Sequence, residues 1–274
     1  MGFLHYVRLI RPLNCVMATF AVYIGYCVSI GEIGFEFLTA YAMVSAFLIC
    51  GAGQAINDYF DREIDMDKAP DKPIPSGKVK PKSALNFSLL LFFVGLVFAW
   101  SINREAATIA IAFTALLIVY AAYLGNYKYL GNWVVAAGTA FTLVFGASVT
   151  QNYFPAVYLA LAALFANVPR EITKDFEDLE ADRGNKVSLP MILPHIWPKV
   201  LILALYLAGI GTGLGLYFLG IYGNAWYLWP ISGASLGFLA SACLAFTGSY
   251  KLSQQLSKIG MLLALLAFLA GVAL

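Results

Sequence analysis

Charged residues are scarce in this 274-residue sequence, where Asp, Glu, Lys and Arg together make up 12%. Soluble domains of ordinary composition carry about 25%, so the composition excludes a typical water-soluble protein. Histidine occurs only twice, and the four cysteines stand alone in apolar runs without metal-ligand spacing. No basic tract of the kind that binds nucleic acid is present. We therefore expect neither a thiolate or imidazole metal site nor a nucleic-acid partner.

Apolar runs recur along the whole sequence, and many approach the roughly 20 residues that cross a bilayer. They lie at about 13–31, 38–56, 84–102, 107–124, 132–150, 156–174, 199–220, 226–246 and 257–274. Long unbroken runs differ from the short alternating segments of a membrane barrel. The predicted fold is an all-α polytopic membrane protein, with nine transmembrane helices around a central cavity in one domain, 1–274.

Basic residues indicate which helix ends face the cytoplasm. With a cytoplasmic N-terminus, 16 of the 17 Lys and Arg residues fall in inside segments, and only Arg104 falls outside. We therefore predict a multi-pass protein of the cell membrane with its N-terminus in the cytoplasm. The two longest polar stretches, 57–82 and 175–198, then both face the cytoplasm.

Acidic residues are concentrated in two places along the sequence. Twelve of the fifteen lie in or directly beside two short segments that share the spacing D-x-x-D-x-x-x-D. The aspartates of the two motifs are Asp58, Asp61 and Asp65, then Asp175, Asp178 and Asp182. On a continuous helix, at about 100° per residue, each set would share one face. Crowded carboxylates repel each other unless a cation joins them, and Mg²⁺ commonly shares oxygen ligands with substrate phosphates. Two such motifs predict a Mg²⁺ site that holds a diphosphate.

Basic residues interleave with these acids. Arg62 and Lys174 lie within the motifs, Lys72 lies in the loop after the first motif, and Lys128 lies in the next cytoplasmic loop. Carboxylates, metal and basic side chains around one cavity are the layout expected for a phosphoryl-type leaving group.

Two other protein classes use acidic motifs in membranes. A cation transporter places its carboxylates in mid-span and often in broken helices, whereas these lie at predicted helix ends beside a basic loop. It stays a remote alternative. An alcohol phosphatidyltransferase needs a motif that begins with aspartate-glycine and has alanine-arginine between its aspartates, and the sequence lacks it.

Four stretches resemble signatures of the UbiA superfamily of intramembrane prenyltransferases. Residues 57–65, N-D-x-x-D-x-x-x-D, with 72–77, K-P-I-P-S-G, resemble the first signature. Residues 175–182, D-x-x-D-x-x-x-D, resemble the second, and 11–14, R-P-L-N, resemble the opening of the first helix of the family. The resemblance covers essentially the whole chain.

This resemblance implies a polyprenyl diphosphate donor. Mg²⁺ would hold its diphosphate between the motifs, and its tail would lie in an apolar tunnel open to lipid. The C1–O bond would ionise to an allylic cation, which a lipid-like acceptor captures. The implied metal ligands are Asn57, Asp58, Asp61, Asp65, Asp175, Asp178 and Asp182. The implied partners of the substrate phosphates are Arg11, Asn14, Arg62, Lys72, Tyr123, Lys128 and Lys174.

Residues 170–178, R-E-I-T-K-D-F-E-D, indicate the branch of the family. They resemble archaeal members that move a geranylgeranyl group onto the free hydroxyl of geranylgeranylglyceryl phosphate, which forms the second ether bond of archaeal lipids. Arg170 and Lys174 would suit an acceptor that carries its own phosphate. The base is expected to be Glu171, or alternatively a phosphate oxygen of a substrate. A quinone precursor, another aromatic acceptor or chlorophyllide stays an alternative, and no obligate protein partner is expected.

Overall fold

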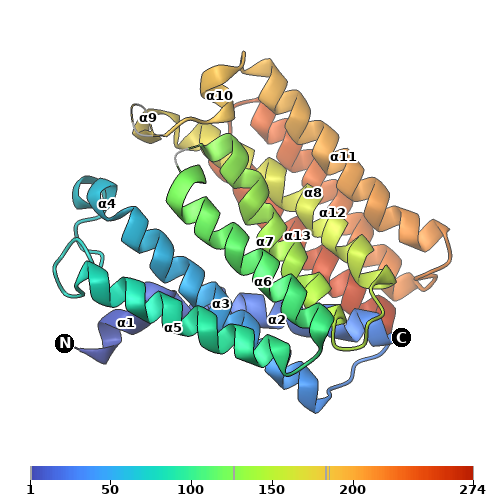
Figure 1. Ribbon diagram of the computed structural model, residues 1–274. Helices are drawn as coiled ribbons and strands as arrows, with labels where there is room; N and C mark the ends of the chain where they lie inside the picture. Colours follow the sequence, from blue (N-terminus) through green and yellow to red (C-terminus); the bar gives the residue numbers. More distant parts are fainter. Residues whose placement is uncertain (1, 126, 183, 185, 274) are drawn as a thin grey trace.

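The computed structural model describes residues 2–125, 127–182, 184 and 186–273. Within these residues the regular structure is helical, and the only β pairing is an isolated bridge between Tyr127 and Val187. The helices pack into one bundle (Figure 1). The all-α prediction is therefore confirmed for the described part of the chain.

Eight helices of the described residues are long and apolar enough to cross a membrane. They are α2 (Pro12–Ile30), α3 (Phe37–Phe60), α5 (Pro81–Trp100), α6 (Arg104–Val119) with its π-helical continuation η1 (Tyr120–Leu124), α7 (Lys128–Ala147), α11 (Ile196–Phe218), α12 (Ala225–Phe246) and α13 (Tyr250–Ala273). A further helix, α8 (Phe154–Glu177), has 24 residues but carries several charged side chains near its end. These helices follow the order of the predicted runs, and the crossing of all nine stays a prediction.

Helix limits agree with the apolar runs within a few residues, with one larger difference. Helix α13 begins at Tyr250, whereas the apolar run begins near residue 257. The first two turns of α13 contain Lys251, Ser253 and Gln254. Hydropathy detects only the part of a helix that suits lipid, so a polar first turn is missed.

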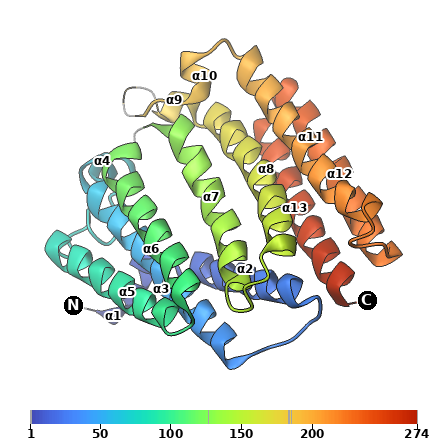
Figure 2. The same cartoon turned by 45° about the vertical axis from the view of Figure 1, so that its right-hand side comes forward.

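Short helices complete the chain. They are α1 (Phe3–Ile10), α4 (Arg62–Lys68), α9 (Leu179–Asp182) and α10 (Leu189–Ile192). Helices α4, α9 and α10 lie at the same end of the bundle in both ribbon views (Figures 1 and 2). The polar stretches 57–82 and 175–198 contain these three helices, so the acidic motifs are brought to a common end.

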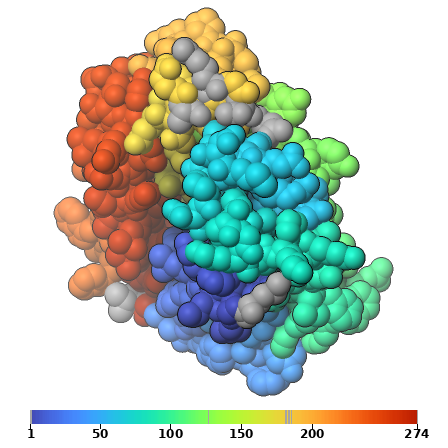
Figure 3. Space-filling view, turned by 90° about the vertical axis from the view of Figure 1, so that its left-hand side faces the viewer, coloured from blue at the N-terminus to red at the C-terminus, as the bar shows by residue number. Residues whose placement is uncertain are grey.

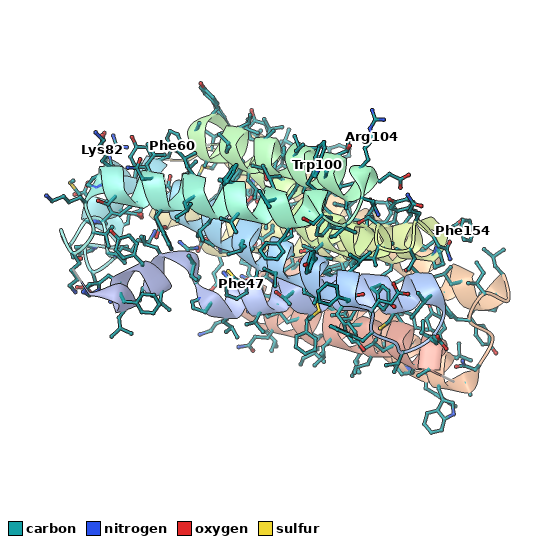
Figure 4. The ribbon with its side chains drawn as sticks, turned by 60° about the horizontal axis from the view of Figure 1, so that its bottom comes forward. Phe47, Phe60, Lys82, Trp100, Arg104 and Phe154 are labelled. Atoms are coloured by element: carbon teal, nitrogen blue, oxygen red, sulfur yellow. The ribbon has the colours of Figure 1, made fainter. Side chains whose placement is uncertain are left out.

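Labelled side chains mark the two ends of the bundle. Phe60 and Lys82 lie at one end, and Trp100, Arg104 and Phe154 lie at the other (Figure 4). Arg104 is the one basic residue that the prediction places outside. Its position at the end opposite Lys82 agrees with that separation of basic residues.

Helices α2 and α7 cross at unusually close range. A Cβ atom added to Gly25 would lie 2.0 Å from the carbonyl oxygen of Leu143, and one added to Gly146 would lie 2.0 Å from that of Val22. Small residues let membrane helices approach until their backbones touch. This reciprocal contact joins the first helices of the chain to the middle of the bundle.

Apolar cores lie on both sides of this crossing. One core contains Ile49 of α3 and Phe92 of α5, and another contains Ile202 of α11 and Phe238 of α12. The bundle therefore has two packed halves, each of which contributes helices to the cavity described next.

Candidate active site

A cavity of about 1100 Å³ lies between the halves, lined by residues of α2, α3, α6, α7, α8, α11, α12 and α13. Its polar end carries Asn57, Asp61, Asp65, Lys72 and Asp175. Apolar side chains line the rest, among them Leu143, Phe145, Leu159, Ile231 and Phe268. The central cavity that the sequence predicts is therefore present, with a charged end and an apolar end.

Both acidic motifs are interrupted at their middle aspartate. Helix α3 ends at Phe60 and α4 begins at Arg62, with Asp61 between them (φ −78°, ψ −1°). Likewise α8 ends at Glu177, and Asp178 (φ −86°, ψ 2°) precedes α9. The expectation that each motif forms one continuous helical face was wrong. The first and third aspartates of each motif nevertheless contact one lysine, whose positive charge reduces their mutual repulsion.

Lys72 is the lysine of the first motif. Its Nζ lies 3.2 Å from Oδ1 of Asp58 and 2.7 Å from Oδ2 of Asp65. Asp58 also accepts a 2.8 Å hydrogen bond from Nη2 of Arg11. Asp58 and Asp65 are buried, so these charge-assisted contacts offset the cost of burying two carboxylates.

Lys128 has the same role in the second motif. Its Nζ lies 3.3 Å from Oδ1 of Asp175 and 3.2 Å from Oδ2 of Asp178, and it also pairs with Asp182. Oδ2 of Asp175 accepts a 2.7 Å hydrogen bond from Asn132. The two motifs therefore repeat both their aspartate spacing and their connection through one lysine.

Asp61 differs from these aspartates because it forms no ion pair with any described residue. It accepts a 2.8 Å hydrogen bond from Nδ2 of Asn57. Burial raises the pKa of Asp61, the nearby charge of Asp65 raises it further, and Lys186 opposes the shift. Asp61 is thus a cavity carboxylate that a cation would stabilise.

The donor atoms at the polar end suit a hard cation. The first motif contributes Asn57, Asp61 and Asp65 to the cavity lining, and the second contributes Asp175. Carboxylate and amide oxygens are the ligands that Mg²⁺ prefers. No group of three or more acidic, His or Cys side chains is arranged to hold a metal among the described residues. The available ligands come from α3, the turn at Asp61, α4 and α8, and all of them face the same cavity.

Other predicted site residues separate into two groups. Arg11, Asn14, Glu171 and Lys174 line the cavity, and Glu171 pairs with Arg170. The remaining ones do not line it in the described structure: Asp58, Arg62, Tyr123, Asp178 and Asp182. Arg62 donates a 2.9 Å hydrogen bond to the carbonyl oxygen of Tyr59, and the side chain of Tyr123 is 74% exposed.

Sequence reasoning missed several cavity residues. Tyr120 lines the cavity one turn before the exposed Tyr123, where α6 changes into the π-helical segment η1. Such segments often occur at functional sites. Asn132 follows Lys128 by four residues, so both project from one face of α7, and this spacing was a usable signal. No sequence signal relates Lys68 to Asp182, whose 3.6 Å ion pair connects α4 to the second motif.

Comparison with known proteins agrees with this arrangement. The sequence profile of the UbiA prenyltransferase family matches residues 18–266. The chain belongs to this family. It is 37% identical to the digeranylgeranylglyceryl phosphate synthase of Methanopyrus kandleri, over 97% of this chain and 98% of the relative. It is 38% identical to the protein of the same name from Methanosarcina mazei, over 99% of each.

Solved structures of UbiA proteins share the fold. One that bears the name digeranylgeranylglyceryl phosphate synthase has a TM-score of 0.86 at 33% identity, over 98% of this chain and 97% of that chain. A UbiA homologue from Archaeoglobus fulgidus, bound to GPP and Mg²⁺, has a TM-score of 0.65 at 16% identity, over 95% and 99% of the two chains. The second likeness concerns the fold alone. The chain is accordingly an all-α prenyltransferase of the UbiA family.

Proposed function

We propose that this UbiA prenyltransferase moves the geranylgeranyl group of geranylgeranyl diphosphate to the free hydroxyl of geranylgeranylglyceryl phosphate, with Mg²⁺. The product carries the second ether bond of archaeal membrane lipids. The observation that carries the proposal is the cavity with both acidic motifs at one end and an apolar lining beyond them. Relatives named digeranylgeranylglyceryl phosphate synthase, similar over nearly the whole chain, support the choice of acceptor.

The diphosphate of the donor would lie at the polar end. The oxygens of Asn57, Asp61, Asp65 and Asp175 would hold Mg²⁺, which neutralises diphosphate charge and makes it a better leaving group. Lys72 and Lys128 would bind the remaining phosphate oxygens. The aspartates behind them would position these lysines: Asp58, Asp178 and Asp182.

The prenyl tail would occupy the apolar part of the cavity. Leu143, Leu159, Ile231 and Phe268 come from four different helices and surround this region. Burying a long hydrocarbon there is favourable by about 25 cal/mol for each Å² of apolar surface. The same side chains exclude water, so the allylic cation meets the acceptor hydroxyl before it meets water.

One bond breaks and one forms in the transfer. The C1–O bond of the donor breaks, and its electron pair leaves with the diphosphate. The acceptor oxygen donates a lone pair to C1, and its proton passes to the carboxylate of Glu171. Glu171 lines the cavity one turn from Asp175, and Arg170 holds it. A diphosphate oxygen is the alternative proton acceptor.

The charges at the two ends support a placement in the membrane. We propose that α8 crosses together with the eight apolar helices, that the N-terminus is cytoplasmic, and that the polar end of the cavity opens on the cytoplasmic side of the cell membrane. The basic stretch that ends with Lys82 at the start of α5, and the opposite position of Arg104, support this orientation.

A transfer assay tests the function. Purified protein would receive radiolabelled geranylgeranyl diphosphate and Mg²⁺ with either geranylgeranylglyceryl phosphate or 4-hydroxybenzoate. We expect a diether that requires Mg²⁺, is lost in Asp175→Asn and persists in the control Asp67→Asn, because Asp67 is exposed on α4 away from the cavity. Transfer to 4-hydroxybenzoate alone would overturn the acceptor, and no transfer to either by folded protein would overturn the function.

A further inference from the structure

The cations of the cavity are of two kinds. Arg11, Lys72 and Lys128 are held by carboxylates at the polar end. Lys174, Lys186 and Lys258 also line the cavity, and none of them has an ion pair or a side-chain hydrogen bond among the described residues. Lys186 lies near Asp61, and its charge acts to lower the pKa of that carboxyl, so Lys186 belongs to the polar end. Lys174 and Lys258 are exposed, and two ammonium groups without a carboxylate partner in one cavity form a site for an anion.

Helices α8 and α13 place these two lysines at the same level. They run in opposite directions, and Nε2 of Gln254 donates a hydrogen bond to Glu177 where the start of α13 meets the end of α8. Lys174 lies three residues before Glu177, and Lys258 lies four residues after Gln254. Each is therefore about one turn, roughly 5 Å, further into the bundle from this contact.

The surroundings show where a bound molecule would extend. On α13, Lys258 is followed along the cavity by Met261, Leu262 and Leu265, spaced as one helical face. Leu262 is 58% exposed and Met17 of α2 is 64% exposed, although both line the cavity. The cavity therefore reaches the surface between α2 and α13, where Figure 3 shows the molecule hollowed between the red C-terminal helices and the blue to cyan N-terminal segments.

We propose that Lys174 and Lys258 bind the phosphate of the lipid acceptor, in a subsite separate from the diphosphate site. This inference rests on the proposed function. A phosphomonoester carries up to two negative charges near neutral pH, and the two ammonium groups match that charge. The acceptor tail leaves the cavity along Leu262 and Met17 into lipid.

The distance between the phosphate and the free hydroxyl of the acceptor also fits the reaction. In a glyceryl phosphate the free hydroxyl is separated from phosphorus by a few bonds, a span of about one helical turn. With the phosphate at Lys174, the hydroxyl lies one turn along α8 from it, beside Glu171. Lys174 precedes Asp175 directly, and adjacent helix positions point about 100° apart. Asp175 therefore serves the donor while Lys174 serves the acceptor, in place of the diphosphate role that the resemblance implied for Lys174.

The test compares Lys258→Met with Lys251→Met, a matched variant of an exposed lysine on the same helix outside this cavity. The KM for donor and for acceptor would be measured separately in detergent. Loss of one hydrogen bond to a charged group predicts an acceptor KM raised roughly tenfold in Lys258→Met. The donor KM and the kcat at saturating acceptor should not change, Lys258→Arg should restore most of the loss, and Lys251→Met should behave as wild type.

A second experiment uses geranylgeranylglycerol, which is the acceptor without its phosphate. Wild type and Lys258→Met should use it equally, and geranylgeranylglyceryl phosphate without donor should raise the melting temperature of wild type more than that of Lys258→Met. If the lysines bind bulk lipid phosphate instead, the defect will follow the anionic lipid content of vesicles and be the same with both acceptors, which overturns the proposal. Diether formation with an unchanged acceptor KM in Lys258→Met overturns this inference alone. A wild type that makes no diether overturns the proposed function.

Discussion

Replacing Lys128 with Met would test whether the second motif is a cation site. The ammonium group contacts Asp175, Asp178 and Asp182, and its removal leaves three carboxylates facing each other. One such contact at about 3.3 Å is worth roughly 5 kcal/mol at an effective dielectric of about 20, but desolvation of the lysine offsets much of this. Breaking a buried ion pair costs about 3–5 kcal/mol net. The melting temperature of the metal-free protein should therefore fall by of the order of 10 °C.

Mg²⁺ should reverse this loss. In the wild type a divalent cation competes with Lys128 for Asp175, whereas in Lys128→Met all three carboxylates are free to bind it. Ligand binding stabilises the folded state in proportion to the logarithm of free ligand over Kd. We therefore expect a larger Mg²⁺-induced rise in melting temperature for Lys128→Met than for wild type.

Scanning fluorimetry in detergent, with and without Mg²⁺, measures both effects. A NaCl series at equal ionic strength separates specific binding from screening, and Lys251→Met serves as the control because Lys251 is exposed and has no ion pair among the described residues. An equal Mg²⁺ response in wild type and Lys128→Met would refute the idea that the metal and the lysine share these carboxylates.

Three further substitutions have expected outcomes. Asp61→Asn should raise the melting temperature of the metal-free protein, since burial raises the pKa of Asp61. At pH values between the ordinary pKa of 3.8 and the raised pKa, Asp61 binds more protons in the folded protein than in the unfolded protein. The contribution of Asp61 to the free energy of unfolding therefore falls as pH rises through this range. Gly146→Ala should cost roughly 1–3 kcal/mol, because its Cβ would lie 2.0 Å from a carbonyl oxygen of α2. Gly211→Ala, with open space around it, should instead gain about 1 kcal/mol.

For each of these substitutions, one result would contradict the expectation. Melting curves of Asp61→Asn and wild type from pH 4 to pH 8 should differ most at the alkaline end, and parallel curves would contradict a raised pKa for Asp61. A thermal stability of Gly146→Ala equal to that of Gly211→Ala would contradict the close crossing of α2 and α7.

Much of the architecture was predictable because a bilayer restricts what a chain can do. Backbone groups in lipid must bond within the segment, so long apolar runs become helices. Residues 13–31 and 226–246 accordingly match α2 and α12 closely. The start of α13 was missed because hydropathy does not register a polar helix turn, and α1 was missed because eight residues are too few to cross the membrane.

The site was predictable in its residue types and only partly in its geometry. The aspartate spacing identified the ligands that line the cavity, Asn57, Asp61, Asp65 and Asp175. It could not show that each motif turns at its middle aspartate, or that Lys128 from another helix contacts the second motif. Tyr120 was overlooked for Tyr123, since the π-helical segment changes which residue of that stretch faces inward.

Sequence alone therefore determined the fold class, the separation of charge between the two ends and the repeated acidic motif, since these depend on composition and local spacing. Tertiary structure decided which charges meet. Lys72 and Lys128 reach their aspartates across loops and from another helix, and Lys174 and Lys258 line one cavity from α8 and α13. Such pairings depend on how helices pack, and no local pattern encodes the distance between side chains that are far apart in the chain.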